Sequence, residues 1–518
     1  MRIPLTALIV TIVLLVGLAL PLQLAAQRSQ PNTAKHHHYK VIDLGTLGGP
    51  ASYFANGFDG ILNNQGTAAG WADTSTPDPY PGFCVNPDCF ASHAFAWRKG
   101  SRTDLGVLPG GSSSYALWIS QNGLITGNSQ NGEIDPLITG LPEIRAVLWR
   151  DGKIIDLGTL EGGHESVTSA VNNRGQIVGA FNNTVSDPFS LVGNGYEVRA
   201  FLWQDGAMED LGTLGGPDAF ALLINERGQV TGQSYTSSTP GPVTGLPPLD
   251  PFLWENGEMI DVGTLGGTSG IPTAFNNRGE VVGQSNLAGD LSFHPFLWTR
   301  RGGIKDLGTL GGNTGLPNWV NDAGEVVGKA DLFGAAPQNH DAVLWRNDEI
   351  TDLGVLPGDS CSNAYYVNSE GQIVGTSEDR AHCLALIGEH AFLWEDGGPM
   401  IDLNSLIPPN SSLRLTYAVA INDRGEIAGF GVPPGVLPDQ FETKGHAYIL
   451  IPCDENHPDL EGCDYNLVEQ GPTVTGATAD QTLSRPSEAA ATQNPLAKNQ
   501  NPFLANPLMR RFGRPWLP

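Results

Sequence analysis

The chain has 518 residues and a formal net charge of −26, from 54 acidic and 28 basic residues. An acidic surface repels phosphate backbones, and no basic stripe interrupts the repeated part of the chain, so we expect no nucleic-acid partner. A body of this length exceeds what one ordinary core can organise, unless it is built of repeats that pack only on their neighbours.

Residues 1–26 are predicted to be a secretory signal peptide. An apolar run from Leu5 to Leu20 is followed by small residues that end at Ala26, the pattern of a cleaved export signal. An uncleaved membrane anchor is the alternative, because the run approaches the length of a span, but Pro21 and the small residues favour cleavage. We therefore expect a chain that is secreted or placed in the cell envelope, with no membrane span after cleavage.

A polar linker is predicted over residues 27–38. Its run of three histidines, His36 to His38, could chelate a metal, but such a run in a linker is weak evidence. From residue 39 to residue 451 the chain is a series of eight repeats, which we predict to be one domain.

The first repeated feature is an Asp, and seven of its eight copies are followed by Leu-Gly or Val-Gly. Its spacing of 45 to 61 residues is near the length of one propeller blade. A carboxylate at the end of a strand can accept backbone N–H bonds from the turn that follows, so we interpret this Asp as structural. The eight copies are Asp43, Asp104, Asp156, Asp210, Asp261, Asp306, Asp352 and Asp402.

A Trp stands seven or eight positions before seven of these Asp residues. Dipeptides such as Asp205-Gly206 and Asn256-Gly257 lie between Trp and Asp and supply the positive φ that a tight hairpin turn needs. We therefore predict one hairpin per repeat, with the Trp side chains filling the space between sheets. These residues are Trp97, Trp149, Trp203, Trp254, Trp298, Trp345 and Trp394.

A second hairpin is predicted 15 to 20 residues after each Asp, as in the run from Val171 to Gly179. It carries Asn-x-x-Gly, in which Asn opens a turn and Gly takes a left-handed conformation at its end. A second Gly follows four residues later in all eight copies, and one copy has Ser120 in place of the Asn.

Two hairpins per repeat give four strands, and eight such sheets arranged radially predict an all-β fold, an eight-bladed β-propeller. The first Asp strand, Tyr39–Gly45, has no Trp-type strand before it, and the last strand of that type, His446–Ile451, has no Asp strand after it. We predict that these two halves pair and close the ring, which removes exposed sheet edges.

The six cysteines fall in three close pairs outside the strand motifs, and an even count in an exported chain favours disulfides. Nearest-neighbour pairing is one of fifteen connectivities, and metal binding is the alternative. Residues 452–466 form a Cys-containing loop and residues 467–518 a tail predicted to be disordered. The candidates are Cys84, Cys89, Cys361, Cys383, Cys453 and Cys463.

Variable segments connect equivalent strands, so they should crowd one rim of the ring, where we would place a binding site. Isolated acids on this rim could supply the carboxylate pair that glycoside cleavage needs. They are Asp135, Glu143, Asp187, Asp250 and Glu389.

No cofactor is predicted. Calcium is the one metal left open, because the loops from Asn321 to Glu325 and from Asn422 to Glu426 are faintly similar to calcium loops but lack their alternating acids. Four repeats place a His before the Trp-type strand, which is too irregular for a metal ring, so a structural role is favoured. These residues are His93, His294, His390 and His446.

The run His390-Ala-Phe-Leu-Trp394, the Asp-Leu-Gly copies and the Asn-x-x-Gly copies together resemble the extracellular HAF repeat family of bacteria over about residues 39–451. The resemblance implies an exported repeat protein and supplies no catalytic residues. Several copies lack the His, as at Arg145 and Arg199.

The sequence favours a monomeric, non-enzymatic scaffold that binds an extracellular carbohydrate, protein or surface partner through one rim. A propeller hydrolase or lyase that acts on polysaccharide is the alternative. A purely structural envelope component is the third possibility.

Overall fold

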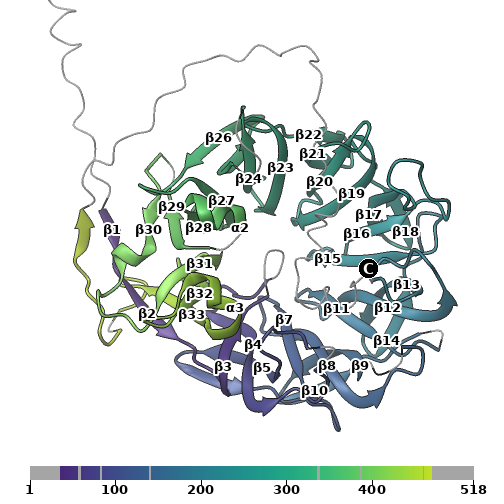
Figure 1. The fold of residues 1–518 in the computed structure, drawn as a ribbon, viewed down its shortest axis with the longest axis horizontal. Helices are drawn as coiled ribbons and strands as arrows, with labels where there is room; N and C mark the ends of the chain where they lie inside the picture. The colour runs from purple at the N-terminus through teal and green to yellow at the C-terminus, as the bar shows by residue number, and fades with distance from the viewer. Residues whose placement is uncertain are drawn as a thin grey trace, which may run out of the picture.

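The computed structural model describes residues 35–55, 60–81, 84–138, 140, 142–160, 162–334, 339–385, 388–395, 397–458 and 460–469. These residues form a ring of eight four-stranded antiparallel blades (Figure 1), and one parallel residue pair, Leu249 with Ser269, joins blades 4 and 5 into a continuous sheet. The predicted signal peptide and residues 470–518 of the predicted tail lie outside the described residues.

Each blade runs from an inner strand at the ring axis to an outer strand, and blade 8 takes its outer strand from the N-terminal part of the chain. In this order, blade 1 contains β3 (Gly48–Tyr53), β4 (Thr67–Pro77), β5 (Phe90–Arg98) and β6 (Ser101–Asp104), and blade 2 contains β7 (Ser114–Ile119), β8 (Ile125–Ile134), β9 (Pro142–Arg150) and β10 (Lys153–Asp156). Blade 3 contains β11 (Ser166–Val171), β12 (Ile177–Ser186), β13 (Tyr196–Gln204) and β14 (Ala207–Asp210), and blade 4 contains β15 (Ala219–Ile224), β16 (Val230–Tyr235), β17 (Leu249–Glu255) and β18 (Glu258–Asp261).

The remaining blades follow the same order. Blade 5 contains β19 (Gly266–Phe275), β20 (Val281–Leu287), β21 (Phe293–Thr299) and β22 (Gly303–Asp306), and blade 6 contains β23 (Gly311–Val320), β24 (Val326–Leu332), β25 (His340–Arg346) and β26 (Glu349–Gly354). Blade 7 contains β27 (Cys361–Val367), β28 (Ile373–Glu378), β29 (His390–Trp394) and β30 (Ile401–Asp402), and blade 8 contains β31 (Arg414–Ile421), β32 (Ile427–Val432), β33 (His446–Pro452) and β2 (Tyr39–Asp43). Short helices α2 (Arg380–Ala385), η1 (Leu403–Leu406), η2 (Pro438–Gln440) and α3 (Phe441–Lys444) lie in loops of blades 7 and 8.

The predicted Trp–Asp hairpin is confirmed as the outer hairpin of blades 1 to 7. In blade 3, β13 and β14 pair antiparallel with Trp203 opposite Met208, and the turn between them has positive φ at both Asp205 and Gly206. Both residues of a type I′ turn have this conformation, and its twist matches that of the strands. All seven repeat Trp side chains are buried, with at most 8% of their surface exposed.

The predicted Asn–Gly turn is confirmed as the connection between the two inner strands. In blade 3 the Asn172 side chain accepts the backbone N–H groups of Arg174 and Gln176, and Gly175 has φ +74°. The second repeat glycine has a different role: a Cβ on Gly179 would overlap the carbonyl oxygen of Val167 on the inner strand. A β-bulge in the inner strand occurs at this level, between Thr168 and Ala170.

Ring closure is confirmed by strand pairing between the two ends of the repeat region. β2 pairs antiparallel with β33 along its whole length, with Val41 opposite Leu450. The N-terminal strand thereby becomes the outer strand of blade 8, next to blade 1 (Figure 1). The two half-repeats of the sequence thus complete one blade, as predicted.

A ring of asparagine side chains joins the blades at the end of the inner hairpins. The Nδ2 of each turn Asn donates to the backbone carbonyl of the equivalent residue in the next blade, and Asn422 of blade 8 donates to Asn63 of blade 1 at 3.0 Å. The bond is formed at seven of the eight blade junctions. At the eighth junction, between blades 2 and 3, the side chain of Ser120 is too short to make this bond. The Asn122 Nδ2 donates to the backbone carbonyl of Asn173 instead, at 2.8 Å.

A short ribbon outside the ring differs from the prediction. β1 (Lys35–His37) belongs to the predicted linker and β34 (Leu467–Glu469) to the predicted tail, yet the two pair antiparallel. The polar composition of both segments gave no sign of a strand, and three residues are too few for a periodic pattern. The chain therefore enters and leaves the propeller at one place.

Asn422→Ala is expected to lower the free energy of unfolding by about 2–4 kcal/mol, because Asn422 is buried and its loss leaves backbone groups at the closing junction without partners. Asn422→Ser should cost less, since the serine at position 120 also accepts a turn N–H. Chemical denaturation measures both. Exposed Asn410→Ala is the control, and equal effects at 410 and 422 would contradict the asparagine ring.

Candidate functional site at the loop rim

The loops that join the second and third strands of each blade lie at one end of the ring. Neighbouring blades are related by rotation about the ring axis (Figure 1), so equivalent loops meet on the same face, opposite the asparagine ring. We call this face the loop rim. It consists of residues 78–89, 135–141, 187–195, 236–248, 288–292, 333–339, 379–389 and 433–445, apart from the positions that the structure does not describe.

Exposed apolar side chains are concentrated on the loop rim. Among the described residues, nine large hydrophobic side chains are exposed, and seven of them lie in a rim loop or in the last two residues of the strand leading into one. Phe333 is the extreme case, with 83% of its surface exposed. The seven are Ile134, Val185, Val243, Leu246, Leu291, Phe333 and Leu437; the other two, Tyr465 and Leu467, lie in the C-terminal segment.

Disulfides and side-chain hydrogen bonds fix several rim loops. Three disulfides are present: Cys84–Cys89 within a rim loop, Cys361–Cys383, and Cys453–Cys463 after the last strand of the ring. Cys361 is the first residue of β27 and not outside the strands as expected, so its disulfide joins the rim loop of blade 7 to the inner strand of that blade. Disulfides are typical of proteins that fold in an oxidising compartment. No helix among the described residues is long and apolar enough to cross a membrane.

The rim loop of blade 3 is bound by residues of blade 4. Asp218 at the start of blade 4 accepts backbone N–H groups from Leu191 in this loop and from Val198 in β13, at 2.6 and 2.9 Å. Burial raises the pKa of Asp218 to about 7, against the effect of these two hydrogen bonds. The hydroxyl of Tyr235 donates to the carbonyl of Phe189 at 2.9 Å. Blade 4 therefore holds the loop of blade 3 in place.

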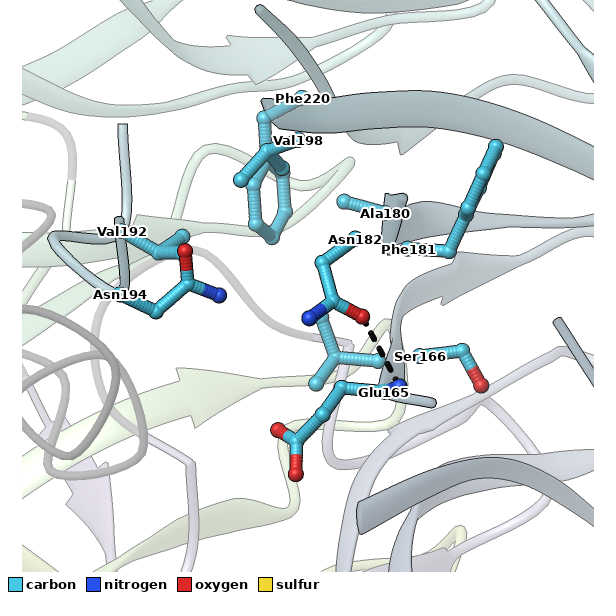
Figure 2. Close-up of a pocket in the computed structure, with 10 residues that line it drawn as sticks. Glu165, Ser166, Ala180, Phe181, Asn182, Val192, Asn194, Val198 and Phe220 are labelled. Atoms are coloured by element: carbon cyan, nitrogen blue, oxygen red, sulfur yellow. Dashed lines mark hydrogen bonds between the residues drawn. The ribbon is translucent and has the colours of Figure 1, made fainter. Parts of the chain in front are cut away.

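A pocket lies beneath this loop, between blades 3 and 4 (Figure 2). The empty space at this site is about 250 Å³ when the open solvent at its mouth is included. Apolar side chains form most of its wall, with Phe220 from blade 4 on one side. The polar lining residues include Glu165, Asn182 and Asn194.

The five acids predicted as possible catalytic residues each bind groups close to their own loop. Asp135, Asp187 and Glu389 lie in rim loops, whereas Glu143 and Asp250 are each the second residue of the strand that follows a rim loop. Asp135 and Asp187 accept backbone N–H groups two residues further on and so shape their own turns. Burial opposes ionisation of Glu143, but the hydrogen bonds and charges around it hold its pKa below the ordinary value. The side-chain partners are Asn131, Arg145 and His164 for Glu143, Asp261 for Asp250, and Arg414 for Glu389.

Two other carboxyls, which were not predicted from the sequence, have larger pKa shifts. Burial, and then Asp88, raise the pKa of Asp73 to about 8, and burial raises the pKa of Glu378 to about 8. Half-buried Lys329 lies near Glu378, and burial lowers the pKa of its ammonium group. The repeat pattern could have drawn attention to both positions. Six repeats have an amide or an acid three residues after the second repeat glycine: Asp73, Gln130, Asn182, Asn286, Asp331 and Glu378.

The repeat Asp carboxylates have a structural role in all eight blades. Each accepts the backbone N–H two residues further on, at 2.7 or 2.8 Å. Three of the four predicted histidines reach this Asp across the outer hairpin: His93 with Asp104, His294 with Asp306 and His446 with Asp43. His390 instead pairs with Asp359 at 3.1 Å, and that hydrogen bond raises its pKa.

Among the described residues, two groups of three could offer ligands to a metal, both in blade 7 and the segment before it. In the first group Cys361 and Cys383 are joined in a disulfide, which leaves the second group. Oxygen and nitrogen atoms of Asp359, Glu389 and His390 lie within 4.8 Å of one another. Arg414 donates to Glu389 and contacts the Nε2 of His390, both at 3.1 Å. The guanidinium therefore occupies the place that a cation would take, and the group is an ion-pair network.

Comparison with sequence families and with curated proteins gave no match. Comparison with solved structures found similar folds at low sequence identity, among them the three that follow. The β-propeller domain of the Trilobed protease from Pyrococcus furiosus is 9% identical, with a TM-score of 0.41, and the match covers 68% of this chain and 98% of that one. The Pyrococcus horikoshii acylaminoacyl peptidase is 11% identical, with a TM-score of 0.39, and the match covers 73% of this chain and 58% of that one. Porphyromonas gingivalis dipeptidyl peptidase 4 is 9% identical, with a TM-score of 0.37, and the match covers 67% of this chain and 55% of that one.

Blades 4 and 6 place an Asp at the position where four blades have His and two have Arg. Burial, and then the neighbouring Asp261, raise the pKa of Asp250 to about 7. Burial, and then the neighbouring Asp352, likewise raise the pKa of Asp341 to about 7. A folded-state pKa above the unfolded value stabilises the protein at low pH, and this contribution is lost as the pH rises through about 7.

Asp250→Asn is therefore expected to raise the melting temperature at pH 8 by roughly 2–4 °C and to have a smaller effect at pH 5. The neutral amide removes the repulsion that the second carboxylate creates at high pH. Thermal unfolding followed by circular dichroism measures the difference. Glu258→Gln in the same blade is the exposed control, and a gain that does not increase with pH would contradict the pairing.

Proposed function

We propose that this protein is a secreted, non-enzymatic scaffold that binds a protein partner through its loop rim. The observation that carries the proposal is the exposed apolar set on that rim. Large exposed apolar surfaces on soluble proteins mark sites of interaction. Seven side chains contributed by six blades are exposed on the same face, while the two other exposed hydrophobics among the described residues lie elsewhere.

The chemistry of these side chains favours a protein over a polysaccharide. Six of the seven are aliphatic and one is Phe333. A polysaccharide presents hydroxyl groups, and covering a hydroxyl with hydrocarbon costs free energy unless it finds a hydrogen-bond partner. A protein surface can match aliphatic side chains with its own. The five acids predicted as possible catalytic residues are bound by neighbouring groups, which also favours binding over catalysis.

Secretion is part of the proposal. The N-terminal export pattern and the three disulfides agree on an oxidising environment outside the cytoplasm. The three ordered motifs support membership of the HAF repeat family, and we propose a monomer with no nucleic-acid partner.

A polysaccharide hydrolase or lyase is the second candidate. Glu378 favours it, because a carboxyl with a pKa of about 8 stays protonated at neutral pH and can act as a general acid. Lys329 lies close enough to interact with it electrostatically. Release of sugars from a polysaccharide panel that disappears in Glu378→Gln would establish this candidate.

Replacing Leu246, Leu291 and Phe333 together by Ser should weaken partner binding at least about tenfold, since buried apolar anchors contribute more than 1 kcal/mol each. Immobilised wild-type protein would first capture partners from the extracellular fraction of the source cells, and calorimetry would then compare the variants. The matched control is Tyr465→Ser with Leu467→Ser, two exposed hydrophobics away from the rim. A partner whose affinity falls with the control instead would contradict the proposal.

A further inference from the structure

Charge is unevenly distributed over the loop rim. The rim loops of four consecutive blades, 8, 1, 2 and 3, contain six acidic residues and one basic residue, whereas those of blades 4 to 6 contain one acid and no base. The turns between the two inner strands, on the opposite face, contain four acids and four arginines. We call the rim loops of blades 8, 1, 2 and 3 the acidic sector; its charged residues are Asp439, Glu442, Lys444, Asp78, Asp88, Asp135 and Asp187.

Three exposed apolar side chains of the rim lie in or beside the acidic sector, and each has an acid within two positions in the chain. Two of these acids, Glu133 and Asp439, are themselves exposed. None of the acids in these pairs forms an ion pair within the described residues, so no cation of this part of the chain matches their charge. The pairs are Ile134 with Glu133 and Asp135, Val185 with Asp187, and Leu437 with Asp439.

A surface of this kind fits a ligand that carries basic and apolar side chains close together. A guanidinium group can form two parallel hydrogen bonds with one carboxylate. An aromatic or aliphatic side chain beside it removes the exposed hydrocarbon from water. An acidic ligand would be repelled by the carboxylates, and a neutral polar one would leave them without a cation.

The chain contains a segment of this composition. Residues 508–517 read Leu-Met-Arg-Arg-Phe-Gly-Arg-Pro-Trp-Leu, with three arginines, two aromatic side chains and no acid. They lie outside the described residues. Their charge is opposite to that of the acidic sector, and their large apolar side chains match its exposed hydrocarbon.

The segment is also within reach of the acidic sector. The chain before β34 lies on the face of the inner turns, where the Nε2 of His457 contacts the Oε1 of Glu426 at 3.3 Å. β33 crosses blade 8 from the rim to that face in seven residues, a rise of about 23 Å. Forty residues lie between Glu469 and Arg510, and a flexible chain of this length has an end-to-end distance of about 35 Å.

We propose that residues 508–517 bind the acidic sector of the loop rim of their own chain. The inference rests on the proposed function, because it makes this segment an internal competitor that a partner covering the whole rim has to displace. A linker that spans the two sites gives an effective concentration on the order of millimolar. A contact with a dissociation constant of about 100 µM would then keep the acidic sector occupied about nine-tenths of the time.

A fluorescent peptide of residues 506–518 tests the contact by anisotropy. Its target is the full chain with Arg510→Glu, Arg511→Glu and Arg514→Glu, which removes the internal competitor and leaves every residue of the ring unchanged. We expect a dissociation constant on the order of 100 µM, and at least about fivefold weaker binding in 0.5 M salt, which screens exposed charges. The wild-type chain should bind the peptide about tenfold more weakly, because its own segment occupies the sector.

Leu437→Ser with Asp439→Asn, added to the charge-reversed chain, should weaken peptide binding at least about fivefold, because it removes an exposed apolar side chain and an exposed acid of the sector. Leu467→Ser with Glu258→Gln is the matched control, since both residues are exposed and lie away from the rim. It should leave peptide binding unchanged.

Ile134→Ser with Glu133→Gln makes the same two changes beside the rim loop of blade 2. It should also weaken peptide binding, which tests whether the sector extends beyond blade 8. Unchanged binding in both rim variants would overturn the assignment to the acidic sector.

The other outcomes that contradict the proposal are distinct. Failure of the peptide to bind the charge-reversed chain, or equal binding by the wild-type chain, would overturn the internal contact. Peptide that binds vesicles of phosphatidylglycerol and phosphatidylcholine but not the protein would assign the segment to a membrane surface. A wild-type chain that dimerises in sedimentation velocity, while the charge-reversed chain stays monomeric, would place the segment on a second copy.

Partner capture and its loss in the serine variant of Leu246, Leu291 and Phe333 test a different part of the rim, on blades 4 to 6. Peptide binding can therefore fail while partner capture succeeds, and the reverse. Failure of this inference is thus distinguishable from failure of the proposed function.

Discussion

Pairing between β2 and β33 is the constraint on which the rest of the molecule depends. The two strands are about 400 residues apart in the chain, and their ladder converts a row of eight sheets into a ring. Bringing such distant segments together carries a loop-closure cost that local contacts do not. The bond from Asn422 to Asn63 joins blade 8 to blade 1 at a second place. Without both contacts the first and last blades would expose unpaired faces to solvent.

In the closed ring, the residues that hold the blades together lie apart from the rim loops, whose sequences can vary. The inner turns are bound to their neighbours around the ring by the asparagine side chains, and the outer hairpins are fixed by the repeat Asp and buried Trp. In the part of the chain that the structure describes, the loops on the opposite face carry no such repeated bonds, and their lengths differ from blade to blade. A binding surface can therefore change in the rim loops without disturbing the ring, which is the usual relation between a rigid scaffold and its loops.

Much of the fold could be predicted because its cause is local. Each repeated feature depends on a few consecutive residues. Examples are the positive φ at Gly175, the type I′ turn at Asp205 and the carboxylate of Asp210, which accepts the backbone N–H of Gly212. Closure of the ring could also be predicted from the sequence, because each of the two half-repeats lacks the strand that the other supplies. The short ribbon of β1 and β34 was missed because three-residue strands leave no periodic pattern.

The candidate site was predictable only in its location. The sequence placed a binding surface on one rim, but it could not tell that Phe333 is exposed whereas Phe392 is fully buried, because both follow apolar strand patterns. The pocket depends on contacts between residues from blades 3 and 4, as with Asn182 and Phe220. Likewise, the raised pKa of Glu378 arises from burial that its neighbours in the chain do not determine.

Hydrogen exchange of the backbone amides tests ring closure most directly. If β2 and β33 complete a blade, their paired amides should exchange as slowly as those between β12 and β13, which lie inside one continuous stretch of chain. Both sets would then open only with the whole ring. Exchange of the β2 and β33 amides many times faster than that of the β12 and β13 amides would show that the ends separate on their own, and the closed ring that supports the loop rim would be contradicted.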